Sequence, residues 1–348
     1  MKRLLTLLLA LVMVLSIAVL AGCNAQKVIP TVGGGDDTAT VADDGGEATE
    51  AAPVDSAPLS PTAFTATIGD YELSFEPILL GGVGGPDSYD YCGDYYDGKY
   101  YLSDEKAKKV YVYSIDGTTA TLENEYDTEV SFEKITVNHN GDILLSQGIF
   151  EAYELLDDGT FDKLPFKHDL ECSKLEDFAV LTWVNADPTV IHDGVEGEWV
   201  FKNINNDDER EGKLSMVFDC EIVGEDVLIG GTYVEDGEDH YRIGVFDYDG
   251  NERTMTAPGD SVGYIALYET DNGIISANVN KIYLHDKNCN PIAELKDLKS
   301  EAGFDSNTVS TFWVKDFSGG DDGELYMLAY ASKADDTKEA LLYKVTGF

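Results

Sequence analysis

Basic residues are scarce in this chain. Its 348 residues include 24 Lys and Arg against 66 Asp and Glu, which gives a formal net charge of −42 at pH 7. Proteins that bind nucleic acid place clustered positive charge against the phosphate backbone, and a surface this acidic repels that backbone. The composition therefore excludes nucleic acid as a partner.

Aromatic residues are absent from the first 63 positions, although the chain has 14 Phe, 20 Tyr and 3 Trp. All of them lie from Phe64 onward, in a segment long enough to bury a large hydrophobic core. The chain therefore divides into an N-terminal part without a core and one folded domain, predicted over residues 63–348.

The N-terminus has the pattern of a secretory signal peptide. Lys2 and Arg3 precede an apolar run that ends in Leu20-Ala21-Gly22-Cys23. A membrane-spanning helix is the alternative, but the strongly basic flank that would normally follow such a helix is missing after Cys23. We therefore predict cleavage of residues 1–22.

The tetrapeptide Leu20-Ala21-Gly22-Cys23 resembles the lipobox of bacterial lipoproteins. The resemblance implies that Cys23 carries a diacylglyceryl group and becomes the new N-terminus. Two acyl chains give stable membrane attachment. The expected location is extracytoplasmic, anchored to the cell membrane by lipid on a Gram-positive cell surface.

Large apolar side chains are nearly missing from residues 23–62, which consist mostly of Gly, Ala, Thr, Pro and acidic residues. A segment of this composition cannot bury enough apolar surface to offset the entropy of ordering. We predict a disordered acidic tether that holds the domain away from the bilayer.

The folded part lacks long amphipathic helices and contains a repeat. β-rich runs, several of them stopped by the turn signal Asp-Gly, occur at residues 109–118, 150–160, 198–206, 241–251, 281–285 and 341–345. A second glycine turn marker precedes most copies by one strand, at Gly98, Gly141, Gly224, Gly273 and Gly323. Two hairpins every 40–50 residues define the four-stranded blade of a β-propeller. The predicted fold is all-β, with six four-stranded blades.

The last repeat ends after its third strand, so one outer strand is missing. Residues 64–75 alternate between apolar and polar and precede the first blade. We predict that this N-terminal strand completes the last blade and closes the ring, which removes exposed edges. A seven-bladed ring and an extended β-sandwich are the alternatives.

Residues 98–104 and 110–117, with the sequences GKYYLSD and VYVYSIDG, resemble blades of six-bladed YWTD, NHL and TolB-like propellers. Those families bind proteins, peptides or sugars, and some members are enzymes. The resemblance therefore implies a fold and not a particular function.

Catalytic motifs are mostly missing from the sequence: it has no GxSxG, no HExxH and no GxGxxG after a strand. Residues 93–99 have the spacing of a phosphate-binding loop, but Tyr100 replaces the magnesium-binding Ser or Thr. We therefore predict a binding or recognition module at the cell surface, with a protein or glycan partner. The alternative is a carbohydrate-active hydrolase or lyase that uses paired carboxylates at the mouth of the central channel.

No cofactor is expected. Weak calcium binding is possible at residues 247–251 and 321–324, which are rich in acidic side chains. Each segment contains an Asp-Gly pair, and a hairpin turn explains that pair equally well. The candidate ligand-binding residues are Tyr89, Tyr91, Tyr95 and Tyr96, which alternate with aspartates near the start of the first blade. Tyrosine suits sugar stacking or a protein contact; packing between blades is the other interpretation. We expect the ligand at the end of the channel where the innermost strands begin.

Cysteine is rare as well. Apart from Cys23 the chain has only Cys92, Cys172, Cys220 and Cys289. In an exported protein a Cys172–Cys220 disulfide is the one plausible pair, and four buried free thiols are the alternative.

Overall fold

A computed structural model describes residues 58–83, 90–148, 150–182, 189–192, 195–198, 214–256, 266–320, 323–333 and 337–348. They belong to one compact unit, Val54–Phe348. The predicted signal peptide, Cys23 and Tyr89 lie outside the described residues. Within the described ranges, no helix is long and apolar enough to cross a membrane.

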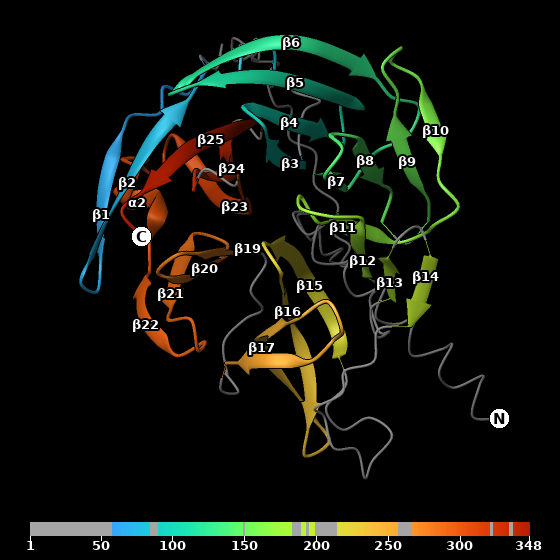
Figure 1. The fold of residues 1–348 in the computed structure, drawn as a ribbon. Coiled ribbons are helices and arrows are strands. Elements are labelled where there is room, and N and C mark those ends of the chain that lie inside the picture. The colour runs from blue at the N-terminus through green and yellow to red at the C-terminus, as the bar shows by residue number, and fades with distance from the viewer. Residues whose placement is uncertain are drawn as a thin grey trace, which may run out of the picture. The chain divides into compact units, whose positions relative to one another are not determined.

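The described strands form six antiparallel sheets, arranged around a central axis in Figure 1. Blades 1 and 2 consist of β3 (Tyr91–Tyr96), β4 (Lys99–Asp104), β5 (Lys109–Asp116), β6 (Thr119–Asp127), then β7 (Lys134–Val137), β8 (Ile143–Ser146), β9 (Ala152–Leu155) and β10 (Phe161–Lys163). Blades 3 and 4 consist of β11 (Asp169–Cys172), β12 (Phe178–Thr182), β13 (Thr189–His192), β14 (Val195–Glu198), then β15 (Leu214–Val223), β16 (Asp226–Glu235), β17 (Glu238–Phe246) and β18 (Glu252–Met255).

Blade 5 consists of β19 (Ala266–Thr270), β20 (Gly273–Asn278), β21 (Lys281–His285) and β22 (Pro291–Leu295). Blade 6 contains β23 (Val309–Gly319), β24 (Leu325–Lys333) and β25 (Lys338–Thr346), and the short helix α2 (Leu298–Glu301) precedes it. The innermost strands β3, β7, β11, β15, β19 and β23 pack side by side in that order, and β23 lies beside β3. The ring is therefore closed, which confirms the predicted six-bladed propeller.

The N-terminal strand closes the ring as predicted. β2 (Tyr71–Ile78) pairs antiparallel with β25, and β1 (Phe64–Ile68) pairs with β2 as a fifth strand of blade 6. In Figure 1 the blue start of the domain accordingly lies beside its red end. The sequence pattern suggested one strand where the structure has a hairpin. The reversal falls at Gly69, whose φ of 61° is readily adopted by glycine.

The hydrophobic core lies between neighbouring blades. Tyr91 and Tyr100 of blade 1 pack in one cluster with Tyr326 and Leu328 of blade 6, and similar clusters join other blades. Both faces of an inner strand are therefore covered: β3 is buried along almost its whole length, and so is β24, the second strand of blade 6. Outer strands such as β6 are mostly exposed.

Several of the predicted tight turns are five-residue loops. In the loop that starts at Asp247, the carboxylate accepts hydrogen bonds from the backbone N–H groups of Asp249 (3.0 Å) and Asn251 (2.8 Å), and from the Asn251 amide (2.7 Å). The loop that starts at Asp286 has the same arrangement. In the loop that starts at Asn138, the amide oxygen accepts from two backbone N–H groups, and the amide nitrogen donates to the Asp142 carboxylate. An Asp-Gly pair occurs in short hairpin turns and in five-residue loops alike, so it predicts a reversal of the chain but not the length of the loop.

All four cysteines of the domain are free and buried, so the Cys172–Cys220 bridge is not formed. Burial raises the pKa of each thiol, to about 12 for Cys289. A thiol in such surroundings behaves as a small apolar side chain rather than as a nucleophile.

Candidate functional site

Charged side chains gather along the axis of the propeller. Alternate residues of an inner strand face the axis, because side chains alternate along a strand. These positions hold five buried carboxylates, Asp94, Glu171, Asp219, Glu221 and Asp316, together with Lys134. Lys174 joins them from the turn that follows β11. The inner strands of five blades thus contribute to one ionic network.

Lys134 connects blades 2, 3 and 4. Its Nζ lies 2.9 Å from Glu171 Oε2 and 3.4 Å from Asp219 Oδ1, and it donates to the Cys220 carbonyl at 3.2 Å. Burial alone would lower the pKa of Lys134, but the two carboxylates raise it well above its usual value. The lysine is therefore charged, and it neutralises part of the acidic channel.

Lys174 connects blades 1, 3 and 6. Its Nζ lies 2.6 Å from Asp94 Oδ1 and donates to the carbonyls of Tyr95 (2.8 Å) and Gly319 (3.1 Å). Asp94 also accepts from the backbone N–H of Val137 at 2.9 Å. All three protons of the ammonium group are thus used within the protein.

Acid is in excess in this network, with five carboxylates against two lysines. The pKa values of Glu221 and Asp316 are raised well above their usual range, first by burial and then by neighbouring carboxylates. Asp316 Oδ1 has no hydrogen-bond partner in the described structure. Asp94, Glu171 and Asp219 have structural roles, since they are held by lysines and backbone amides. The alternative of a hydrolase or lyase gains no support.

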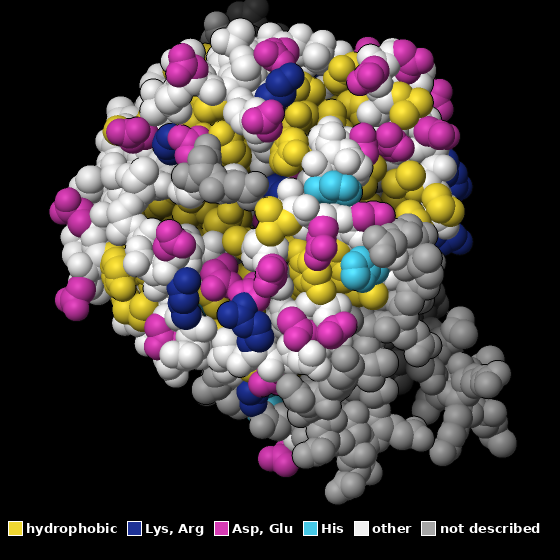
Figure 2. Space-filling view, in the orientation of Figure 1, with side chains coloured by type: hydrophobic (Ala, Val, Ile, Leu, Met, Phe, Trp, Pro, Cys, Tyr) yellow, Lys and Arg dark blue, Asp and Glu magenta, His cyan; other side chains and the backbone are white. Residues whose placement is uncertain are grey.

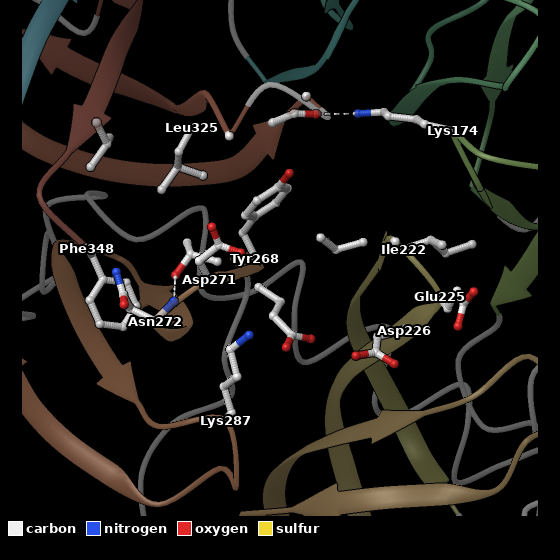
Figure 3. A pocket seen from close by; sticks show the side chains of 18 of the residues that line it. Lys174, Ile222, Glu225, Asp226, Tyr268, Asp271, Asn272, Lys287, Leu325 and Phe348 are labelled. Atoms are coloured by element: carbon white, nitrogen blue, oxygen red, sulfur yellow. Dashed lines mark hydrogen bonds between the residues drawn. The ribbon is translucent and has the colours of Figure 1, made fainter.

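A cavity of about 750 Å³, which we call the large cavity, opens at the end of the channel where the inner strands end, which we call the exit face. It is lined by Lys174 and Leu175, by Ile222–Asp226 and Arg253 of blade 4, by Tyr268–Asn272 and Lys287 of blade 5, and by Gly319, Gly320, Gly323, Leu325 and Val345–Phe348 of blade 6. Figure 3 shows Lys287, Asp226 and Tyr268 around the same space. We predicted a ligand at the opposite end, where residues 84–89 and 257–265 lie outside the described ranges.

The large cavity holds charges of both signs. Arg253 forms an ion pair with Asp226. Glu269 Oε2 is buried and has no hydrogen-bond partner among the described residues. Burial raises the pKa of Glu269, and the positive charges of Lys287 and Arg253 oppose this effect. The cavity therefore offers a ligand an unused acceptor, Glu269, and an exposed donor, Lys287.

A second exit-face cavity, of about 180 Å³, lies between blades 2 and 3. Its apolar residues are Leu144, Leu164, Phe166, Leu170, Cys172, Phe178, Ala179 and Ile191, and its acidic residues are Asp142, Glu154, Glu176 and Asp177. It contains no lysine or arginine among its described lining residues. This small cavity is thus an apolar groove with acidic side chains.

Three of the candidate tyrosines, Tyr91, Tyr95 and Tyr96, lie between blades. Tyr91 and Tyr95 are buried, and the Tyr95 ring lies 4.4 Å from that of Tyr326. Tyr96 is half-buried, and its hydroxyl donates to the His139 carbonyl at 3.0 Å. The structure thus shows packing and hydrogen bonds for these three residues, while ligand binding by Tyr89, Tyr91, Tyr95 and Tyr96 stays a prediction.

The residues considered for calcium have other roles where they are described. Both oxygens of Asp247 accept hydrogen bonds of its own loop. Glu324 is hydrogen-bonded to Tyr95, Tyr326 and Lys344. Within the described ranges, no group of three or more His, Cys, Asp or Glu residues is placed to hold a metal ion.

The two cavities and the ionic network were not predicted from the sequence. One signal was present: Asp219 and Glu221 interrupt an otherwise largely apolar inner strand. Charged residues in such a strand must find partners when they are buried. Which residues meet, however, depends on the register of six strands that are distant in sequence.

The closed ring of six four-stranded sheets defines the chain as a β-propeller. No protein-family model and no curated protein matches it. Similar solved structures include the β-propeller domain of Cps50 (Swd1) from Myceliophteria thermophila, with 9% identity, a TM-score of 0.49 and coverage of 74% of this chain and 98% of that one. The WD40 β-propeller domain of Doa1 has 11% identity, a TM-score of 0.43 and coverage of 80% and 96%. The likeness concerns the fold alone.

Proposed function

We propose that this protein is a non-enzymatic recognition module that binds its ligand at the exit face. The observation that carries the proposal is the large cavity. It is built by loops of four blades, 3 to 6, and has the size range of natural ligand pockets. Its Lys287 and Glu269 can contact a ligand, whereas Lys134 and Lys174 of the channel are already bound to Glu171, Asp219 and Asp94.

We further propose that the module is attached to the outer face of a bacterial membrane through a lipid on Cys23. The lipobox-like Leu20-Ala21-Gly22-Cys23 and the acidic segment of residues 23–62 support this location. A tether of that length would let the propeller reach a protein or glycan partner beyond the bilayer.

Thermal unfolding of the full mature chain in detergent tests the recognition function. Oligosaccharides, short peptides and calcium chloride are added separately, because any compound that binds only the folded state raises Tm. We expect at least one compound to raise Tm. That rise should be lost in Lys287→Gln and Glu269→Gln, and kept in the control Lys296→Gln, which changes an exposed lysine outside the cavity.

Two results would contradict the proposal. One is the absence of any Tm shift across the panel. The other is a shift that persists unchanged in both cavity variants, because the ligand would then bind elsewhere on the molecule.

A further inference from the structure

The two exit-face cavities share one turn. Residues 173–177 connect β11 to β12; Lys174 and Leu175 line the large cavity, and Glu176 and Asp177 line the small one. Leu175 is 52% exposed, which is unusual for a large apolar side chain in this domain. The turn is therefore a ridge with an apolar residue on it and a cavity on each side.

The ridge is held firmly in place. The Tyr248 hydroxyl of blade 4 lies 2.8 Å from both Ser173 Oγ and the Gly224 carbonyl. The Tyr248 ring stacks on Phe178, with 3.9 Å between ring centroids. A surface fixed in this way loses little entropy when a partner binds.

Carboxylates without a basic partner surround the ridge. Seven carboxylates of the two cavities form no ion pair with a described lysine or arginine. They are Asp142, Glu154, Glu176 and Asp177 in the small cavity, and Glu225, Glu269 and Asp271 in the large one. Arg253 is paired with Asp226, and Lys174 is bound to Asp94. Lys287 is the remaining cation of the lining. Figure 2 agrees, since acidic side chains outnumber basic ones on the face that it shows.

The negative charge and the apolar surface of the exit face together indicate what kind of partner binds there. We propose that the exit face docks an extended segment of a protein partner in which Lys or Arg side chains lie next to apolar ones. The small cavity takes one side chain of this segment against Leu170 and Phe178, and its carboxylates bind the cationic end. The segment then crosses Leu175, and a second cation reaches Glu269. This inference rests on the recognition function and gives its partner a chemical class.

Two other possible occupants, the predicted tether and a second copy of the chain, carry the wrong charge. Residues 23–62 contain one Lys and seven Asp or Glu, so the predicted tether is repelled by the acidic rim. A second copy carries the same net charge of −42 and is repelled as well. A basic segment is instead attracted, and opposite charges speed its encounter with the surface.

The test uses three synthetic 12-residue peptides and the full mature chain in detergent, with fluorescence anisotropy as the readout. One peptide alternates Lys and Leu, a second alternates Lys and Ser, and a third alternates Glu and Leu. The inference expects only the Lys-Leu peptide to bind well, with at least tenfold higher affinity than the Lys-Ser peptide. Because the rim charges are exposed, its affinity should also fall at high salt.

Variants locate the binding surface. Leu175→Ser and the pair Glu176→Gln with Asp177→Asn should each weaken Lys-Leu peptide binding at least tenfold. The matched controls are Leu79→Ser, at a leucine that is 66% exposed, and Glu72→Gln with Glu76→Gln on β2. These controls should change the affinity less than twofold. All changes lie at exposed positions, and a thermal melt verifies folding.

Equal losses in the test and control variants would overturn the inference, because attraction by the overall charge would then explain binding. Equal affinity for the Lys-Leu and Lys-Ser peptides would also overturn it, as would a concentration-dependent dimer that the peptide dissociates. If no peptide binds while an oligosaccharide still raises Tm through Lys287 and Glu269, the recognition function stands and the basic partner is wrong.

Discussion

Val279 has a backbone conformation that β-branched residues rarely adopt. Its φ is +55°, in the turn between β20 and β21, and its carbonyl accepts a hydrogen bond from Val314 N–H of blade 6 at 2.8 Å. A left-handed conformation costs such a residue about 1–2 kcal/mol. The contact between blades 5 and 6 thus holds a strained residue in place.

Replacing Val279 by Asn should therefore stabilise the protein by about 1 kcal/mol, because Asn tolerates the left-handed region. Urea denaturation measures the free energy of unfolding. The control is Val130→Asn, at a half-buried valine without positive φ, which should not stabilise. A loss of stability in Val279→Asn would show that the valine side chain matters more than the strain.

The raised pKa values of Glu221 and Asp316 predict how stability depends on pH. Each group holds its proton more tightly in the folded than in the unfolded chain. Their stabilising contribution is therefore complete below the unfolded pKa values, near 4, and is lost as pH rises through the folded pKa values. Lowering the pH from 8 towards 5 should stabilise the domain.

An isosteric replacement isolates this effect. Asp316→Asn removes the cost of ionising a buried carboxyl, so it should stabilise the protein at pH 8. The gain should shrink on acidification. Denaturation of this variant and of the exposed-turn control Asp70→Asn at pH 8 and pH 5 gives the comparison. A gain that is the same at both pH values would exclude ionisation as its cause.

At the scale of elements, the five-residue turns depend on one side chain that accepts hydrogen bonds from the N–H groups of the turn. Asp247 accepts three hydrogen bonds within its turn, whereas Asp249 contributes only its backbone N–H to that set. Asp247→Ala should lower the free energy of unfolding by about 1–2 kcal/mol, since it leaves turn N–H groups without an acceptor. Asp249→Ala in the same turn is the matched control and should have little effect in the same denaturation experiment.

The sequence predicted the blades because turn signals recur at a regular interval, and it predicted ring closure because one outer strand was missing. It did not predict the reversal at Gly69, where apolar alternation continues through the hairpin. It also could not indicate that Asp94 meets Lys174. Both faces of an inner strand are covered, so alternation does not tell which face lies at the axis.

At the scale of the whole molecule, the proposed attachment through Cys23 predicts where the protein is found. Cys23→Ser should move it from the membrane fraction to the soluble extracellular fraction and abolish labelling by a palmitate analogue. Asn24→Ser, at the next position, should change neither. Continued membrane retention of Cys23→Ser would contradict the lipid anchor.

The pairing of β2 with β25 joins residues from the two ends of the domain, with Ser74 opposite Thr346. During synthesis the N-terminal hairpin emerges first, yet its partner strand is among the last to follow. Blade 6 can therefore be completed only after nearly the whole chain has been synthesised, and until then the edge of β2 is open to pairing with other chains. The first strands of the domain to be made are thus the last to reach their final positions.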